Sequence, residues 1–425
     1  MQNNIVEKDK ECVWHPFTHL SLNEDAIHIT KGEGVYLIDA DGNKLIDAIS
    51  SWWVNLHGHC HPYINKKIIE QTNTLEHAIF SGFTHTPAVM LAQRLLEHLP
   101  NNQSKIFYSD NGSTAVEVAL KMTLQYFHNK GITKKKFIAL ENAYHGDTFG
   151  GMSVGARNVF NQAYENVLFD VIHIPLPNKE NIEDLKQTLE TWFTHHKDIA
   201  GFIFEPLVQG AAGMLMYEAE YLDELITICK KHNVICIADE VMTGFGRTGD
   251  FFASNYLTQK PDIICLSKGL TGGYLPLGVT SSAQFIYDAY IHEDKTKTFF
   301  HGHSYTANPI ACSVALASMD LMEQEQTWQQ IELIANSHQI FVSHIKKHPN
   351  IIDSRCKGVI LALEIKTDEH RHYLNKISET MASFFLKKNI IIRPLGNVLY
   401  LIPPYCITKE ELSYIYTVIE EYLNV

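Results

Sequence analysis

The sequence predicts an α/β fold built around a mostly parallel β-sheet, and three observations lead to this class. First, apolar runs of four or five residues recur between residues 105 and 266, and each has the length of a buried strand. Second, helical periodicity lies between them, as where Leu222, Leu225, Ile226 and Cys229 follow the spacing of one buried helix face. Third, a chain of 425 residues that is 45% hydrophobic can bury a large core and is long enough for two domains. Strands that alternate with helices form a sheet covered on both faces.

The first expected element is a hairpin over residues 34–50, where two apolar stretches flank Asp41-Gly42. The segment "DADGN" could also be interpreted as a calcium-binding loop. The ligand spacing and the terminal glutamate of an EF-hand loop are missing, which favours the turn. The buried strands follow at residues 105–108, 136–140, 201–204, 234–238 and 262–266.

Composition excludes several classes of partner. The net charge of -13 makes binding to nucleic acid or to an anionic membrane surface unfavourable. The N-terminal stretch has no apolar signal core, and no later stretch is apolar over enough residues to span a bilayer, so we expect a cytoplasmic protein.

The scattered cysteines predict reduced core thiols without a disulfide frame or a zinc site; they are Cys12, Cys60, Cys229, Cys236, Cys265, Cys312, Cys356 and Cys406.

Polar residues follow four of the expected strands at the point where each strand ends. Parallel strands bring their carboxyl ends to one edge of the sheet, where ligands bind, so we expect these residues to share a crevice. They are Tyr144, His145 and Asp147 after the second strand, Glu205 after the third, Asp239 and Glu240 after the fourth, and Ser267 and Lys268 after the fifth.

Lys268 and Asp239 together suggest pyridoxal phosphate as a cofactor. A lysine can form a Schiff base with the cofactor aldehyde, and a carboxylate can keep the ring nitrogen protonated. Taken alone, Lys268 also fits a surface lysine whose charge reaches solvent, and Asp239 also fits a helix cap.

The segment "YSDNGSTAVEVALKM" (108–122) predicts a cradle for a phosphate group. A strand runs into Asn111, Gly112, Ser113 and Thr114, and helical periodicity then begins. Free N–H groups at a helix start, with a glycine that permits close approach, form an anion site. Small polar residues also cap ordinary helices, so the segment supports a phosphate site only in combination with Asp239 and Lys268.

Two longer motifs, "ADEVMTGFGRTG" (238–249) and "PDIICLSKGLTGGYLPLG" (261–278), resemble the class-III pyridoxal-phosphate aminotransferases of fold type I. The resemblance extends over essentially the whole chain. It implies a large cofactor domain over residues 61–312 with a mostly parallel central sheet. It also implies a smaller α/β domain formed by residues 1–60 together with residues 313–425.

Further segments resemble the branch of this class that serves biotin synthesis, among them "WHPFT" (14–18), "SSWWVNLHGHCHP" (50–62), "FFHGHSY" (299–305) and "IRPLGNVLYLIPP" (392–404). That branch aminates 7-keto-8-aminopelargonate, usually with S-adenosylmethionine as amino donor. It works as a homodimer with active sites at the subunit interface, so the resemblance implies a homodimer here.

The resemblance also implies a role for each matching residue. Lys268 would be the Schiff-base lysine, Asp239 would hold the pyridine nitrogen, and Tyr144 would lie against the ring. Gly112 and Ser113 would bind the phosphate, with Ser304 reaching it from the partner subunit. The substrate-binding residues would be Phe17, Trp52, Trp53, Gly302, Arg393 and Tyr400. If Trp52 and Trp53 are neighbours on a strand, they face opposite sides, and one of them is an ordinary core residue.

Phe17 departs from the pattern, because many S-adenosylmethionine-dependent members carry tyrosine there. A branch that uses lysine as donor also carries phenylalanine, whereas Trp52-Trp53 favours S-adenosylmethionine. The same cofactor residues would also serve an omega-aminotransferase for another amine, a glutamate-1-semialdehyde aminomutase, or a pyridoxal-binding protein without turnover.

Two features have a second interpretation. His57, His59 and His61 alternate and would align three imidazoles on one face of a strand, as in a metal site, but no fourth ligand follows at a recognisable spacing. We therefore expect no metal. Arg247 has both a catalytic interpretation and a structural one, in which it positions its own loop.

Overall fold

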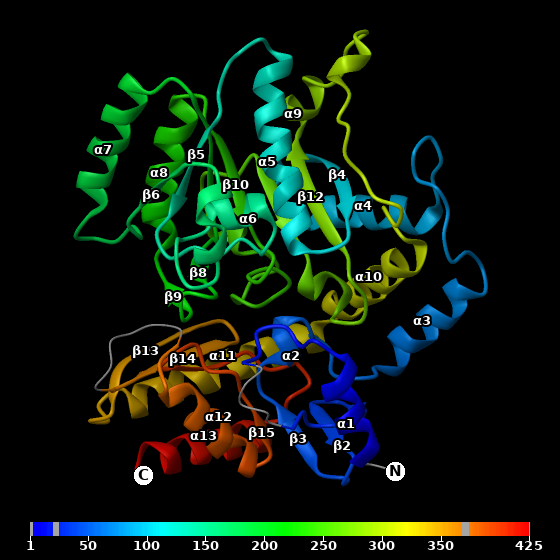
Figure 1. Cartoon of the computed structure of the whole chain (residues 1–425), viewed down its shortest axis with the longest axis vertical. Coiled ribbons are helices and arrows are strands. Elements are labelled where there is room, and N and C mark those ends of the chain that lie inside the picture. Colours follow the sequence, from blue (N-terminus) through cyan, green and yellow to red (C-terminus); the bar gives the residue numbers. More distant parts are fainter. Residues whose placement is uncertain (1–2, 20–24, 368–373, 425) are drawn as a thin grey trace.

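The computed structural model describes residues 3–19, 25–367 and 374–424 and divides into an upper and a lower part in Figure 1. The upper part contains a large sheet between helices. The lower part contains both chain ends, blue and red, with smaller sheets between them. The class predicted from the sequence, an α/β fold with a mostly parallel central sheet, is confirmed.

The central sheet has seven strands in the order β4-β12-β11-β10-β7-β5-β6. All five predicted strands are present, as β4 (Gln103–Ser109), β5 (Lys136–Leu140), β7 (Ile199–Phe204), β10 (Ile235–Asp239) and β11 (Ile263–Leu266). The sequence analysis missed β6 (Val171–Ile174) and β12 (Gly278–Ala283). Strand β12 is antiparallel to both of its neighbours, whereas β5, β6, β7, β10 and β11 run parallel.

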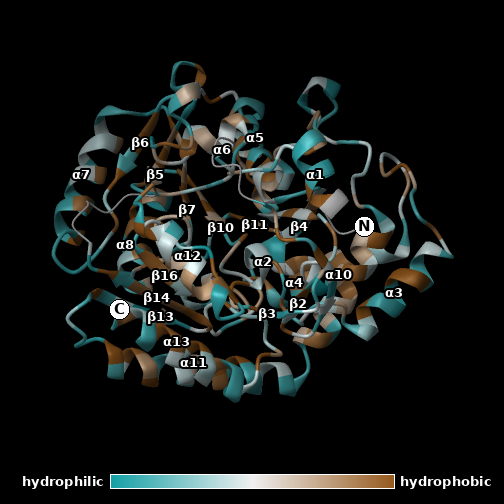
Figure 2. Ribbon diagram, turned by 60° about the horizontal axis from the view of Figure 1, so that its bottom comes forward, coloured by the Kyte–Doolittle hydropathy of each residue, from teal (hydrophilic) through white to brown (hydrophobic). Residues whose placement is uncertain are grey.

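Both faces of this sheet are buried, which explains the continuous apolar runs in its strands. Alternate residues such as Phe137, Ile203 and Ile237 pack against α5 (Gly112–Asn129) on one face. Their neighbours, such as Ile138 and Phe202, join the core that includes α7 (Ile182–His195) and α8 (Ala219–Lys231). The helix predicted around residues 222–229 is therefore confirmed as α8. Hydrophobic strands between helices with hydrophilic outer surfaces are visible in Figure 2.

The two ends of the chain meet in one sheet. The predicted hairpin is confirmed as β2 (Tyr36–Asp39) and β3 (Lys44–Asp47), which pair antiparallel; Gly42 takes a φ of 87° at the turn. Strand β3 also pairs in parallel with β15 (Ile390–Ile391), about 340 residues later. N-terminal and C-terminal segments thus share a sheet, while the domain boundaries at residues 60 and 312 stay a prediction.

The C-terminal segment adds a three-stranded antiparallel sheet of β13 (Ile351–Lys357), β14 (Ile360–Ile365) and β16 (Val398–Leu401). The remaining described elements are α1 (Asn3–Cys12), β1 (Ile29–Glu33), α2 (Ser50–Trp53), α3 (Pro62–Thr72), α4 (Thr86–His98), α6 (Phe149–Val154), β8 (Val208–Gln209), β9 (Leu215–Met216), α9 (Gln284–Asp288), α10 (Pro309–Met322), α11 (Glu325–Ile345), α12 (Ile377–Lys387) and α13 (Lys409–Leu423), with short 3₁₀ turns between some of them.

The cysteines agree only partly with the expectation of core thiols. All eight are free, and Cys229, Cys236, Cys265 and Cys312 are buried. Cys12, Cys60 and Cys406 are exposed, so the expectation is wrong for these three.

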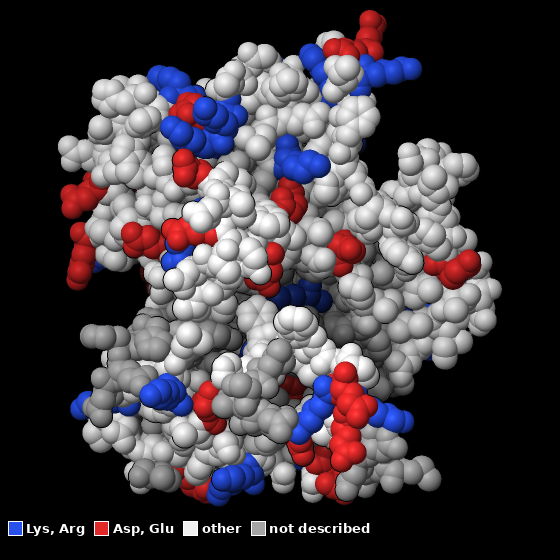
Figure 3. Space-filling view, viewed as in Figure 1, with Lys and Arg blue, Asp and Glu red and all other residues white. Residues whose placement is uncertain are grey.

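None of the described helices is both long enough and apolar enough to cross a bilayer. Figure 3 shows positive and negative side chains scattered over the visible face, with neither sign forming a continuous patch.

Candidate active site

A cavity of about 750 Å³ lies between the carboxyl edge of the central sheet and segments from both ends of the chain. Its lining includes ten of the twelve residues that the sequence predicted for the site: Phe17, Trp52, Trp53, Gly112, Ser113, Tyr144, Asp239, Lys268, Arg393 and Tyr400. Four predicted strand ends therefore do meet at one crevice. Glu240 turns away from it and accepts the N–H groups of Ala253 and Ser254 inside the protein.

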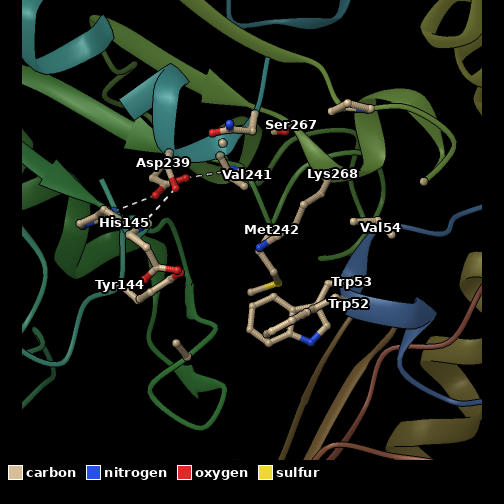
Figure 4. A pocket seen from close by; sticks show the side chains of 18 of the residues that line it. Trp52, Trp53, Val54, Tyr144, His145, Asp239, Val241, Met242, Ser267 and Lys268 are labelled. Atoms are coloured by element: carbon tan, nitrogen blue, oxygen red, sulfur yellow. Dashed lines mark hydrogen bonds and ion pairs between the residues drawn. The ribbon is translucent and has the colours of Figure 1, made fainter. Parts of the chain in front are cut away.

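Asp239 ends β10 and is only 5% exposed. Its Oδ2 atom lies 2.7 Å from Nδ1 of His145, and its Oδ1 atom accepts the N–H of Val241 at 3.1 Å (Figure 4). The carboxylate thus stabilises the turn after the strand and faces the cavity; no helix begins in this described part of the chain, so the helix-cap alternative is wrong. A buried carboxylate held by two polar partners keeps a fixed position at the cavity.

The start of α5 borders the cavity with the geometry that an anion site requires. The Asn111 side chain accepts the N–H of Thr114 at 2.9 Å and caps the helix, which leaves the first-turn N–H groups of Gly112 and Ser113 at the cavity edge. A Cβ atom on Gly112 would lie 2.7 Å from Cγ1 of Val241, so a glycine is required by the close packing here. Gly146, with a φ of 105°, lets the following loop approach Ser113, whose Oγ accepts the N–H of Asp147 at 3.2 Å.

Lys268 follows β11 and reaches into the cavity, so the surface-lysine alternative is wrong (Figure 4). Its φ of 45° is left-handed, a strained backbone state for a residue with a Cβ. Burial lowers the pKa of its amine to about 8, although the charges of Asp239 and Glu205 partly oppose that shift. A substantial fraction of the amine is therefore neutral and nucleophilic near physiological pH.

Trp52 and Trp53 lie on a tight turn, so the expectation that they face opposite sides of a strand is wrong. Positive φ angles at Ser50, Ser51 and Trp53 coil the backbone, and both indoles line the cavity. Trp53 is 5% exposed and donates from Nε1 to the Tyr400 hydroxyl at 2.9 Å. The cavity is thus walled by residues almost 350 positions apart in the chain.

Arg393 stacks on the outer tryptophan, with Cζ 4.7 Å from the centroid of the Trp52 ring. No carboxylate in the described part of the chain forms an ion pair with this guanidinium, which faces the cavity. Phe17 lies on the same side, with its ring centroid 5.4 Å from that of Trp52 and 5.9 Å from that of Phe160. An unpaired arginine among aromatic rings can bind an acid that has an apolar body.

Glu205, His145, Val241 and Phe160 also line the cavity, although none of them was assigned a role from the sequence. Glu205 accepts the N–H of Tyr144 at 3.1 Å and that of Gly210 at 2.9 Å. Burial raises the pKa of Glu205 to about 7, and the charge of Asp239 adds to that effect. The sequence analysis had placed Glu205 and His145 at the crevice because each follows an apolar strand. Nothing in the local sequence indicated Phe160.

Gly302 and Ser304 are the two predicted site residues that do not line the cavity. They belong to the segment 299–305, in which Phe300 and Tyr305 are 74% and 67% exposed. Their predicted roles require a second subunit and stay predictions.

The three alternating histidines are not on a strand and have separate partners. His57 lies 2.9 Å from the Ser318 hydroxyl, His59 lies 2.9 Å from Asp47, and His61 precedes α3. Within the described ranges, no three histidine, cysteine or acidic side chains are grouped as metal ligands.

Arg247 is almost fully buried outside the cavity lining, at 1% exposure. Its guanidinium donates to the carbonyl oxygens of Asn55 and Pro403, each at 3.0 Å. This geometry agrees with the structural interpretation, because Arg247 fixes the backbone next to Trp53 and Tyr400.

The cavity residues fit pyridoxal phosphate, the cofactor that the sequence motifs imply. The capped start of α5 offers donors for a phosphate, Asp239 offers a buried carboxylate, and Lys268 offers an amine. The glycine positions 112 and 146 leave room where a Cβ would collide with neighbouring atoms.

Comparisons with known proteins agree with this site. The model of the family described as aminotransferase class-III matches residues 20–423. A similar protein from Synechococcus elongatus is 45% identical over 97% of this chain and 98% of its own length, and one from Staphylococcus aureus is 39% identical over 96% and 95%. Both are named adenosylmethionine-8-amino-7-oxononanoate aminotransferase.

Solved structures show the same likeness. An adenosylmethionine-8-amino-7-oxononanoate aminotransferase from Methanocaldococcus jannaschii superposes with a TM-score of 0.95 at 36% identity, covering 100% of this chain and 99% of that one. An amine transaminase from an uncultivated Pseudomonas species, solved with its pyridoxal phosphate bound, gives a TM-score of 0.90 at 30% identity, covering 97% and 98%.

Proposed function

The chain belongs to the class-III aminotransferases, which are pyridoxal-phosphate-dependent transaminases, and we propose that it makes 7,8-diaminopelargonate for biotin synthesis. The acceptor would be 7-keto-8-aminopelargonate, also called 8-amino-7-oxononanoate, and the donor would be S-adenosylmethionine. Arg393, which forms no ion pair with any described residue, carries the proposal together with the aromatic cavity beside it, because this acceptor joins a carboxylate to an aliphatic chain.

When bound, pyridoxal phosphate accepts the amino group of the donor, draws electrons into its ring and passes the amino group to the keto acid. Gly112 and Ser113 would bind its phosphate, Asp239 its ring nitrogen, and Tyr144 would lie against the ring. Lys268 would hold the cofactor covalently between turnovers. Its freed Nζ atom would then move a proton from the donor's α-carbon and, in the second half-reaction, to the product carbon.

The identity of the donor depends on the aromatic side of the cavity. Trp52 presents an indole face, which suits a sulfonium cation and its adenosine, and it stacks with Phe17 edge to face. Phe17 has no hydroxyl to donate, so lysine is retained as the alternative donor. An omega-aminotransferase for another amine is the second candidate function.

We also propose a cytoplasmic homodimer. Its support is a set of exposed hydrophobic side chains near α3, α4 and the segment 299–305: Ile69, Ile79, Phe83, Val89, Met90, Phe300 and Tyr305. In a dimer, Ser304 would reach the phosphate of the partner's cofactor and Gly302 would border its substrate. Light scattering of the purified protein tests this assembly, since a mass of one chain contradicts it.

A single half-reaction followed by absorbance tests the proposed donor. The purified yellow enzyme is mixed with S-adenosylmethionine or lysine separately, without keto acid. Loss of the yellow colour with S-adenosylmethionine alone is the expected result. Loss with lysine alone would assign the chain to lysine-dependent amination. No change with either donor would contradict the proposed reaction.

The second half-reaction separates this reaction from those of related transaminases. The pyridoxamine-loaded enzyme should regain its yellow colour with 7-keto-8-aminopelargonate and release diaminopelargonate, measured by mass spectrometry. An omega-aminotransferase for a different amine would respond to small aldehydes and leave this keto acid unchanged. An aminomutase would instead convert glutamate-1-semialdehyde with no external donor.

A further inference from the structure

We infer that Arg355 is a positioning residue that fixes one wall of the active-site cavity from the C-terminal sheet. It lies on β13, and its side chain is 11% exposed. Its Nε atom donates to the carbonyl oxygen of Met214 at 2.8 Å, and Nη2 donates to that of Gly213. One guanidinium thus binds two consecutive carbonyl groups of a loop about 140 residues earlier in the chain.

Two carboxylates orient this guanidinium from its own sheet. Nη1 pairs with Asp353, and it lies 3.8 Å from Oε2 of Glu364. Asp353 and Glu364 are partners in the β13–β14 register. The guanidinium of Arg355 therefore binds carboxylates through Nη1 and loop carbonyl groups through Nε and Nη2. A single ammonium group could not make both sets of contacts in this geometry.

The loop that Arg355 holds is the tip of the small hairpin formed by β8 and β9. At this tip, Ala211 lines the cavity, and the N–H of Gly210 donates to Glu205 at 2.9 Å. A Cβ atom on Gly210 would lie 3.1 Å from Cζ3 of Trp53, so the loop backbone packs directly against that indole. Displacement of the tip would therefore alter the cavity wall, the support of Trp53 and the environment of Glu205 together.

The backbone of the hairpin needs such support. Leu207 and Met214 have φ angles of 67° and 55°, a left-handed conformation that is unfavourable for residues with a Cβ. Gly213 has a φ of 81°. Arg355 binds the carbonyl groups of Gly213 and Met214, at the end of the loop opposite Leu207, so loss of the guanidinium should let the end that contains Met214 relax.

This position predicts a larger effect on substrate affinity than on cofactor binding. The wall formed by Ala211 and Trp53 borders the cavity, whereas Gly112, Ser113 and Asp239 come from elements that Arg355 does not contact. A shift of the wall should raise KM for the keto acid about tenfold, with kcat changed less than about threefold. The substrate part of this expectation rests on the proposed function.

The test compares Arg355→Met with Arg355→Lys and with Lys357→Met as a matched control. Lys357 lies on the same strand but stacks on Tyr256 and does not contact the loop. Hydrogen exchange of the holoenzyme is measured by mass spectrometry over residues 208–216. We expect at least tenfold faster exchange at the loop amides in Arg355→Met, a smaller increase in Arg355→Lys, and none in Lys357→Met.

Exchange and kinetics separate the possible results. Unchanged loop exchange in Arg355→Met would overturn the inference, whatever the substrate is. Equal losses of kcat and cofactor binding would also overturn it, because they indicate general destabilisation. If Arg355→Met does not fold, the same two measurements on Arg355→Lys decide the matter. Failure of the wild-type enzyme to use the keto acid would contradict the proposed function but leave the exchange result valid.

Discussion

The amine of Lys268 lies over the indole of Trp53, with Nζ 4.5 Å from the ring centroid. This contact closes the apolar side of the amine, while Asp239 and Glu205 attract its charge from the other side. The balance favours the neutral form more than in an exposed lysine, because burial lowers the pKa to about 8. The indole of Trp53 thus forms part of the surroundings that bury this amine.

The first prediction concerns the pH dependence of this amine. In the cofactor-free enzyme, the rate of acetylation at Lys268 should rise with pH and reach half its maximum near pH 8, because only the neutral amine reacts. Quantitative mass spectrometry of the modified peptides measures the rate. Lys66, 71% exposed at its side chain, is the control in the same digest. Identical pH profiles for the two lysines would contradict the prediction.

The second prediction concerns Asp239→Asn. The amide keeps the shape of the side chain but removes the negative charge next to the cofactor ring, so the half-reaction with donor should slow by about 10² to 10³. Stopped-flow absorbance measures this rate. Asp262→Asn is the control, because Asp262 is also buried and accepts the N–H of Cys236 without lining the cavity. A comparable loss of rate in both variants would indicate a structural effect instead.

The third prediction concerns Arg393→Met. Loss of a charge-assisted pair with the substrate carboxylate removes about 1.5 to 3 kcal/mol of binding, so KM for 7-keto-8-aminopelargonate should rise roughly tenfold or more. Steady-state kinetics at saturating donor measure the change. A carboxamide analogue of the keto acid should react alike with the wild type and the variant. The role of Arg393 would be refuted if both enzymes kept the same KM for the keto acid.

The fourth prediction concerns Phe17→Tyr. The ring contacts Trp52 and Phe160 edge to face and lines the cavity, so we expect a hydroxyl added to it to meet bound substrate. One hydrogen bond contributes about 1 kcal/mol, which lowers KM for S-adenosylmethionine roughly fivefold. Half-reaction kinetics over a range of donor concentrations check this value. An unchanged KM would show that the hydroxyl finds no partner in this cavity.

The central sheet and the positions of Asp239 and Lys268 at the cavity were predictable because their signals are local. A buried parallel strand is a short apolar run, and the residue after it reaches the crevice, as for Asp239 and Lys268. Strand β12, "GVTSSA", was missed because its small hydroxylated residues have no apolar pattern, although it is fully buried. Its burial comes from its neighbours in the sheet, which the sequence does not reveal locally.

The far side of the cavity depends on contacts distant in sequence. Tyr400 meets Trp53 only because the two chain ends fold together, and the family resemblance, not the spacing of residues, placed it in the site. The turn that carries Trp52 and Trp53 could not be read from "SSWW", since positive φ angles in serine and tryptophan are imposed by surrounding structure. Phe160 reaches the cavity from a loop without any sequence signal.

The last prediction tests the close packing between the phosphate cradle and the turn after Asp239. In Gly112→Ala, the new methyl group would lie 2.7 Å from Cγ1 and 3.1 Å from Cγ2 of Val241. Relief of this clash must shift Val241 or the start of α5, and overpacking of this kind costs about 1 to 3 kcal/mol. We therefore expect affinity for pyridoxal phosphate to fall roughly tenfold, measured by titration of the cofactor-free enzyme with tryptophan fluorescence as readout.

Val241→Ala supplies the matched second change, because it removes both colliding methyl groups. The double variant Gly112→Ala/Val241→Ala should recover most of the affinity that Gly112→Ala loses, so the two effects should be strongly non-additive. If the effects add instead, the methyl group acts by blocking the cofactor phosphate itself and not through Val241. The double-mutant cycle thus distinguishes two causes of weaker cofactor binding. One is the contact between residue 112 and Val241, and the other is direct steric exclusion of the cofactor phosphate by the new methyl group.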